Sequence, residues 1–128
     1  EGPNIHFLGK RPYEQLPSYL RGIDVCIIPF EVNEITLSVD PIKIYEYLAA
    51  GKPVVSTFLP ELQKFGDRVR IAKNREDFEN QIREALREDG ALVSKRIDLA
   101  RSNTWEERAR RISQIIDELL IAKRGTAG

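Results

Sequence analysis

The sequence predicts one α/β domain, a Rossmann-like parallel sheet of about four strands with helices on both faces. Three observations predict it. Short apolar runs alternate with segments of helical period, the order typical of βαβ units. The runs contain few polar residues, as expected of strands that are buried on both faces of a sheet. The chain has 128 residues, enough to bury one core but not two.

The first predicted unit is a strand over residues 5–8, closed by Gly9, and a helix over residues 13–20. In that helix the apolar residues recur at helical spacing. A second buried strand covers residues 25–30. It contains Cys26, the single cysteine of the chain, which we expect to be a small core residue rather than a reactive thiol.

A polar stretch without period, residues 31–39, is predicted to be a loop. Pro41 suits a first helical turn and Gly51 suits the left-handed residue that ends a helix, so a helix is expected from Pro41 to Ala50. The apolar, β-branched run that follows at 53–55 predicts the third strand.

The rest of the chain continues the alternation. Asn74 and the capping box at 104–107 predict the starts of two amphipathic helices. The domain is predicted to end at residue 122, with a frayed tail over 123–128. The other predicted elements are a short helix at 60–65, a turn at 66–67, a strand at 69–72, a helix from 75 that ends before Gly90, and a weaker helix at 91–100.

Composition excludes several classes of protein. Twenty basic residues balance twenty acidic ones, so no overall field favours nucleic acid or an anionic membrane. One cysteine excludes disulfides and a cysteine-based zinc site. Without an apolar run of about 20 residues or a secretion signal, a soluble cytoplasmic domain is expected.

Three features predict that the chain is a piece of a larger protein. It begins at Glu1 and contains no methionine. Four strands are also few for a doubly wound fold. A sheet of this size leaves an open edge, which would allow self-association.

The candidate site lies at the start of the 41–50 helix. Ligands in open α/β sheets bind beyond the carboxyl ends of the strands, and the loop that leads to this helix is longer than usual. Lys43 and Glu46 are three residues apart, beside unpaired backbone N–H groups that attract phosphate. The loop brings Thr36, Ser38 and Asp40 next to Lys43. An ordinary solvated ion pair of Lys43 and Glu46 explains their spacing equally well.

Other notable residues receive structural interpretations. His6 lacks partners at metal-ligand spacing, and Trp105 is expected to anchor the last helix by packing. Glycine-rich nucleotide motifs and the G-x-S-x-G hydrolase motif are absent, so nicotinamide binding, a P-loop and hydrolase chemistry lack their usual signatures.

Four ordered motifs resemble one family. Asn4 to Gly9, Leu16 to Phe30, Asp40 to Ser56 and Asn103 to Trp105 resemble the carboxyl-terminal, donor-binding domain of GT-B glycosyltransferases, specifically glycosyl transferases group 1, or family 4. The third is the strongest, a helix and strand of the form "p-x-K-x-x-E-x-l-A-x-G-x-PVV". The resemblance covers nearly the whole chain.

The resemblance implies roles for individual residues. Glu46 corresponds to the second Glu of an E-x7-E motif that binds ribose; the first falls on Ser38, and Asp40 is a candidate replacement. Lys43, with Pro41 and Ile42 at the helix start, corresponds to the phosphate site. Arg11 lies in a loop that contacts the base. No catalytic residue is assigned.

The implied function is the transfer of a sugar from a nucleotide-sugar to a glycan or glycoconjugate, in polysaccharide biosynthesis and without a metal or other cofactor. An amino-terminal acceptor domain is implied but absent, so the piece alone is expected to be inactive. One alternative is a non-catalytic nucleotide-binding or receiver-like module, although Asp24 precedes its strand rather than following it. The other is a degenerate GT-B half that acts in assembly.

Overall fold

A computed structural model describes residues 2–126, and its sheet is parallel and three-stranded. The strands are β1 (Cys26–Ile28), β2 (Val54–Thr57) and β3 (Arg70–Ala72), in the order β1-β2-β3. Cys26 pairs with Val54, and Ser56 pairs with Ile71. The predicted α/β class is therefore confirmed, with one strand fewer than expected.

The missing strand is the one predicted over residues 5–8. This segment has no regular secondary structure, and its Ile5, Phe7 and Leu8 are 56%, 76% and 52% exposed. A short apolar run becomes a strand only when its backbone pairs with a neighbour. Within residues 2–126, β1 pairs with β2 alone, so the prediction for 5–8, His6 included, is wrong here.

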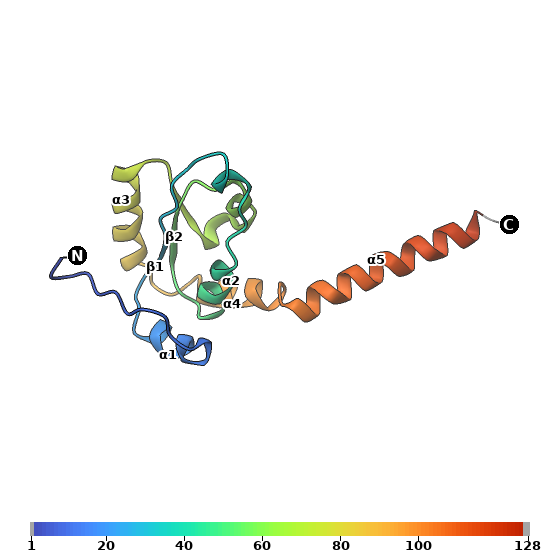
Figure 1. The fold of residues 1–128 in the computed structure, drawn as a ribbon, viewed down its shortest axis with the longest axis horizontal. Coiled ribbons are helices and arrows are strands. Elements are labelled where there is room, and N and C mark those ends of the chain that lie inside the picture. The colour runs from blue at the N-terminus through green and yellow to red at the C-terminus, as the bar shows by residue number, and fades with distance from the viewer. Residues whose placement is uncertain (1, 127–128) are drawn as a thin grey trace.

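The helical elements follow the predicted order with shifted ends (Figure 1). The expected 13–20 helix splits, because Pro17 lies at the start of its α-helical part. The last helix continues to Gly125, within the range predicted as a tail, and residues 127–128 lie outside the described range. The helices are η1 (Tyr13–Gln15), α1 (Leu16–Arg21), η2 (Thr36–Ser38), α2 (Lys43–Ala49), η3 (Pro60–Arg68), α3 (Arg75–Leu86), α4 (Val93–Arg101) and α5 (Trp105–Gly125).

Helices cover both faces of the sheet, as predicted. Successive side chains of β2 point to opposite faces, and both Val54 and Val55 are 0% exposed. On the Val54 face, α2 inserts Ile44 and Leu48 into the core, while α3 packs against β2 and β3 from the other side (Figure 1). Cys26 is buried, as predicted, and burial raises the pKa of its thiol to about 11.

The helix ends follow local chemistry. Gly51 ends α2 with φ of 71°, and Asn74 Oδ1 accepts from the N–H of Asp77 at 2.9 Å to begin α3. Thr104 caps α5 through the N–H of Glu107 at 3.2 Å. These three predictions are confirmed.

A buried arginine that the sequence did not flag connects α4 to the sheet. Arg96 is 1% exposed; it donates to the backbone oxygen of Arg68 at 3.2 Å and to Glu88 at 2.6 Å. Glu88 also accepts from Arg70 of β3 at 2.9 Å. This network fixes α4 beside α2, the helix that carries the candidate site.

The last helix, α5, extends away from the rest of the molecule (Figure 1). All residues from 109 to 126 are exposed. Trp105 is 72% exposed, so the prediction that it anchors the helix by packing is wrong. Among residues 2–126, no helix combines the length and apolar character needed to cross a membrane.

Candidate functional site

The start of α2 presents one positive side chain and two free backbone donors. The N–H groups of Ile42 and Lys43 have no hydrogen-bond acceptor within residues 2–126. Pro41 has no N–H and is buried, so Ile42 and Lys43 supply the free donors of this helix start. The Lys43 ammonium lies 4.7 Å from the ring centroid of Phe30, which follows β1. The positive charge is thus held at the carboxyl end of a strand.

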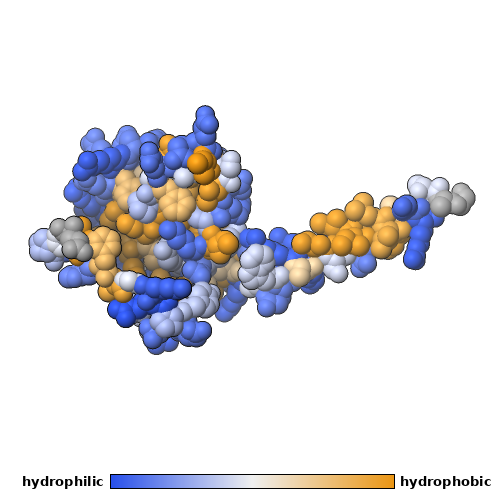
Figure 2. Space-filling model, in the orientation of Figure 1, coloured by the Kyte–Doolittle hydropathy of each residue, from blue (hydrophilic) through white to orange (hydrophobic). Residues whose placement is uncertain are grey.

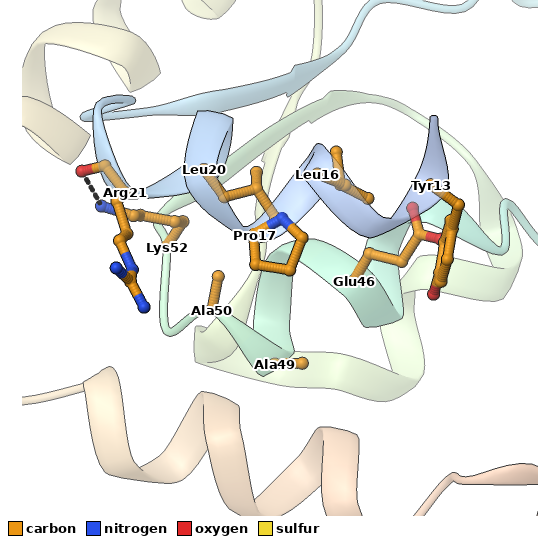
Figure 3. A pocket seen from close by; sticks show the side chains of 9 residues that line it. All are labelled: Tyr13, Leu16, Pro17, Leu20, Arg21, Glu46, Ala49, Ala50 and Lys52. Atoms are coloured by element: carbon orange, nitrogen blue, oxygen red, sulfur yellow. Dashed lines mark hydrogen bonds between the residues drawn. The ribbon is translucent and has the colours of Figure 1, made fainter. Parts of the chain in front are cut away.

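Glu46 lies one turn further along α2, on the wall of a cavity of 490 Å³ between α1 and α2. Its carboxylate points toward the ring of Tyr13 at one end of the cavity (Figure 3). Leu16 and Leu20 provide apolar lining. The far end is closed by Lys52, which donates to the backbone oxygen of Arg21 at 3.3 Å.

A second cavity, of 670 Å³, adjoins the first. Tyr13 and Glu46 line both cavities, and the second continues past Tyr45 to Trp105 at the start of α5. Glu46 therefore lies on the wall that the two cavities share, and it is half-buried.

Asp40 faces another side chain as well as the second cavity. Its Oδ2 pairs with Lys64 of η3 at 3.1 Å, while its Oδ1 is buried and has no hydrogen-bond partner within residues 2–126. Burial lowers the pKa of Lys64, but the hydrogen bond to Asp40 and nearby negative groups raise it more, so the net pKa is above its ordinary value. One oxygen of Asp40 is thus already engaged.

The structure does not bring Thr36 and Ser38 to these cavities. Thr36 Oγ1 donates to the backbone oxygen of Glu31 at 2.6 Å and accepts from the N–H of Asn33 at 2.9 Å, so it holds the loop together. Ser38 is exposed at the end of η2. Neither lines the two cavities beside Glu46.

The loop after residue 9 contributes Tyr13 rather than Arg11. Arg11 is exposed and lines neither cavity, whereas Tyr13 lines both. In the sequence, Tyr13 is the first residue of the predicted 13–20 helix and follows the loop that contains Arg11. An exposed aromatic residue just before an apolar helical pattern is the signal that would have singled it out.

The residues around α2 offer three kinds of contact, although Lys43 lines neither of the two cavities beside Glu46. The start of α2 can hold an anion through Lys43 and two N–H groups. Glu46 can accept hydrogen bonds from hydroxyl donors, and the Tyr13 ring can lie against a flat apolar group. Within the described part of the chain, no three His, Cys, Asp or Glu side chains are grouped as a metal site.

Comparison with known proteins identifies the family of the chain. Residues 1–88 match the model of a family described as glycosyl transferases group 1. The chain belongs to this family. The matched range includes the candidate site on α2 and ends shortly after α3, so α4 and α5 lie beyond it.

One relative of the chain is a Bacillus subtilis (strain 168) protein whose provisional name is teichuronic acid biosynthesis glycosyltransferase TuaH. The two are 40% identical over 62 residues, which are 48% of this chain and 16% of TuaH. The matched part of the chain thus spans about a sixth of that relative's length. No solved structure was found to match the chain.

Proposed function

We propose that this chain provides the nucleotide-sugar donor site of an enzyme that transfers a sugar to a glycan or glycoconjugate. The observation that carries the proposal is the position of Glu46. It stands on a cavity wall opposite the Tyr13 ring and one turn from Lys43 (Figure 3). Family membership supports the same assignment, because the match includes all three residues.

Each group has a place in a nucleotide-sugar. The Glu46 carboxylate accepts from the two neighbouring hydroxyls of ribose, a pair of donors that suits its two oxygens. The Lys43 ammonium and the N–H groups of Ile42 and Lys43 hold the diphosphate. The base lies against Tyr13, on the side of Arg11.

The sugar lies toward the loop that ends at Asp40. The buried Oδ1 of Asp40 lacks a protein partner within residues 2–126, so it is the acceptor that we assign to a sugar hydroxyl. Lys64 holds the other oxygen at 3.1 Å and keeps the carboxylate oriented. Thr36 supports the loop through its hydrogen bond to the backbone oxygen of Glu31, and Ser38, which lines neither cavity, is left outside the proposed sugar contact.

Catalysis in the proposed enzyme depends on position and fixed charge. Lys43 and the α2 donors stabilise the nucleoside diphosphate as it departs, and the cavity orients the sugar. An acceptor needs a second surface, so we propose that this chain alone binds the donor and does not transfer the sugar. Polysaccharide biosynthesis is the proposed setting, in line with the name of TuaH.

The site is tested by calorimetric titration of the chain with UDP, GDP and ADP. Glu46→Gln removes the charge that strengthens two hydrogen bonds, so the affinity for the preferred diphosphate should fall about tenfold or more. Lys43→Gln should have a similar effect. Glu84→Gln and Lys95→Gln, on α3 and α4, are matched controls and should bind like the original chain.

Two results of this titration would contradict the proposed site. If both α2 variants keep the circular dichroism spectrum and the affinity of the original chain, the diphosphate binds elsewhere. If no diphosphate binds at millimolar concentration, the chain is not a donor site, and a role in assembly takes its place.

Metal independence is tested in the same cell. We expect EDTA to leave the affinity for the diphosphate unchanged, because Lys43 and backbone N–H groups supply the positive charge. A strong loss of binding on chelation, restored by Mg²⁺, would contradict the proposal.

A further inference from the structure

The start of α5 places the single tryptophan of the chain in the wall of the second cavity. Trp105 is 72% exposed and lines this cavity of 670 Å³ together with Tyr45. A large aromatic side chain that is left open in a cavity wall can lie against a ligand. Figure 2 shows hydrophilic surface where α5 leaves the body and apolar surface further along the helix. A ligand that meets Trp105 therefore also meets polar side chains.

Arg108 holds hydrogen-bond donors beside the Trp105 ring. Its guanidinium lies 5.6 Å from the ring centroid of Trp105 and 5.0 Å from that of Tyr45. Contacts between a cation and two aromatic rings restrain the position of the guanidinium. Its N–H groups have no hydrogen-bond acceptor and no acidic partner within residues 2–126. Arg108 is half-buried and lines the second cavity, so its donors are available to a ligand there.

Two hydrogen-bond acceptors line the same end of the cavity. The Glu106 carboxylate has no salt-bridge partner within residues 2–126. Asn103 donates through Nδ2 to the backbone oxygen of Leu99 at 2.8 Å, and in the same range its Oδ1 accepts no hydrogen bond. An aromatic face is thus combined with free donors and free acceptors. We call this region the Trp105 end of the cavity; it is formed by Asn103, Trp105, Glu106 and Arg108.

The side chains around the cavity favour one class of ligand. A purely apolar ligand would remove Arg108 and Glu106 from water without replacing their hydrogen bonds. A strongly anionic ligand would be repelled by the three carboxylates that line the cavity and outnumber its two guanidinium groups. A neutral saccharide unit carries hydroxyls that both donate and accept, and its C–H face can lie against an indole ring. The carboxylates are those of Asp40, Glu46 and Glu106, and the guanidinium groups are those of Arg101 and Arg108.

We propose that the Trp105 end binds an uncharged saccharide unit of the glycan that receives the sugar. The C–H face of this unit lies on the Trp105 ring, Arg108 donates to one hydroxyl, and Glu106 accepts from another. Its assignment to the acceptor glycan rests on the proposed function, whereas the saccharide contact itself rests on the side chains of the Trp105 end. The unit lies behind the reacting end of the glycan, which still needs the second surface.

The fluorescence of Trp105 tests the proposal directly, because the full 128-residue chain contains no other tryptophan. The probes are four neutral hexasaccharides: maltohexaose, cellohexaose, mannohexaose and chitohexaose. We expect at least one of them to shift the emission to shorter wavelength with saturation at millimolar concentration, since the saccharide removes water from the indole ring. Hexanol and citrate, an apolar and an anionic probe, should not give a saturable shift.

Variants on α5 test the individual contacts. Arg108→Gln and Glu106→Gln should each weaken binding of the best hexasaccharide at least about fivefold, because each loses a charge-assisted hydrogen bond. Arg124→Gln and Glu118→Gln are matched controls on the same helix; both residues are exposed and line neither cavity beside Glu46, so these variants should bind like the original chain. Trp105→Ala, followed by calorimetry, should bind at least about tenfold more weakly.

Three results would overturn the saccharide site. They are the absence of a saturable shift with all four hexasaccharides, a stronger response to hexanol or citrate, and unchanged affinity in Arg108→Gln and Glu106→Gln when both keep the circular dichroism spectrum of the original chain. Titration of the original chain with nucleoside diphosphates separates this proposal from the donor site. Saccharide binding without diphosphate binding rejects the donor site alone, and diphosphate binding without saccharide binding rejects the saccharide site alone.

Discussion

Helices α3 and α5 begin in the same way and end in different surroundings. Both have a polar N-cap, and both carry an apolar stripe. The apolar face of α3 packs on β2 and β3, with Ala85 only 3% exposed, although Leu86 at its end is 59% exposed. In α5 the large apolar residues from Ile112 to Ile121 are all at least 50% exposed. The period of a sequence thus predicts a helix and its apolar face, but not which surface covers that face.

The difference also bears on stability. The packed elements contain the core around Leu48 and Phe65, both nearly inaccessible to solvent. The apolar stripe of α5 contributes no such burial. Substitutions in the two regions should therefore differ in their effect on the free energy of unfolding.

The largest contrast is expected between Leu48→Ala and Leu119→Ala. Leu48 is 0% exposed, so its truncation leaves a cavity and should lower the free energy of unfolding by about 2–5 kcal/mol. Leu119 is 64% exposed, and its truncation should change that free energy by less than about 0.5 kcal/mol in dilute solution. Urea unfolding of both variants measures the contrast, and equal losses would contradict the division of the molecule.

A second contrast uses two glycines. Gly51 has φ of 71°, and a Cβ there would lie 2.8 Å from Cγ1 of Val93, so Gly51→Ala should cost about 1–3 kcal/mol. A Cβ at Gly125 of α5 meets nothing within 4 Å, and Gly125→Ala should leave the unfolding midpoint unchanged. An unchanged midpoint for Gly51→Ala would show that α2 and α4 are not tightly packed at this point.

The two N-caps give a smaller contrast. Asn74→Ala removes the acceptor for the N–H of Asp77 and should lower the free energy of unfolding by about 1 kcal/mol. Thr104→Ala removes the matching acceptor in α5, which extends from the body. It should reduce the helical signal in circular dichroism without moving the urea midpoint. A shift of that midpoint would mean that α5 unfolds together with the body.

The smallest expected effects concern one carboxyl group in α3 and one in α5, and how their protonation changes with pH. A hydrogen bond from the backbone of Lys73 lowers the pKa of Asp77, and a hydrogen bond from Arg110 lowers the pKa of Glu107. Each carboxylate therefore stabilises the folded state fully above its ordinary pKa, and this stabilisation is lost as the pH falls through the lowered pKa. We expect NMR spectra to show both carboxyl groups titrating at a lower pH than the same residue types do in unstructured peptides. Titration at ordinary values would show that these bonds do not persist in solution.

Local chemistry was predictable from the sequence, and long-range pairing was not. Gly51, Asn74 and Thr104 each act within a few residues of their own position, and all three predictions are confirmed. The run at 5–8 has the composition of a strand, but it needs a partner edge that no local pattern supplies.

The candidate site shows the same division. The spacing of Lys43 and Glu46 predicts that they share the start of α2, and the structure places them there. The pairing of Asp40 with Lys64 joins residues 24 positions apart, and Tyr13 meets Glu46 across two helices. Such contacts depend on how the elements pack, so no local pattern in the sequence predicts them.

The most direct measurement of the proposed function is a ¹H–¹⁵N NMR titration of the chain with its preferred nucleoside diphosphate. Donor binding at the start of α2 should give the largest shifts at the backbone N–H groups of Ile42 and Lys43, with further shifts at Glu46 and Tyr13, and little change on α3. Shifts centred on α3, or none at millimolar diphosphate, would contradict it.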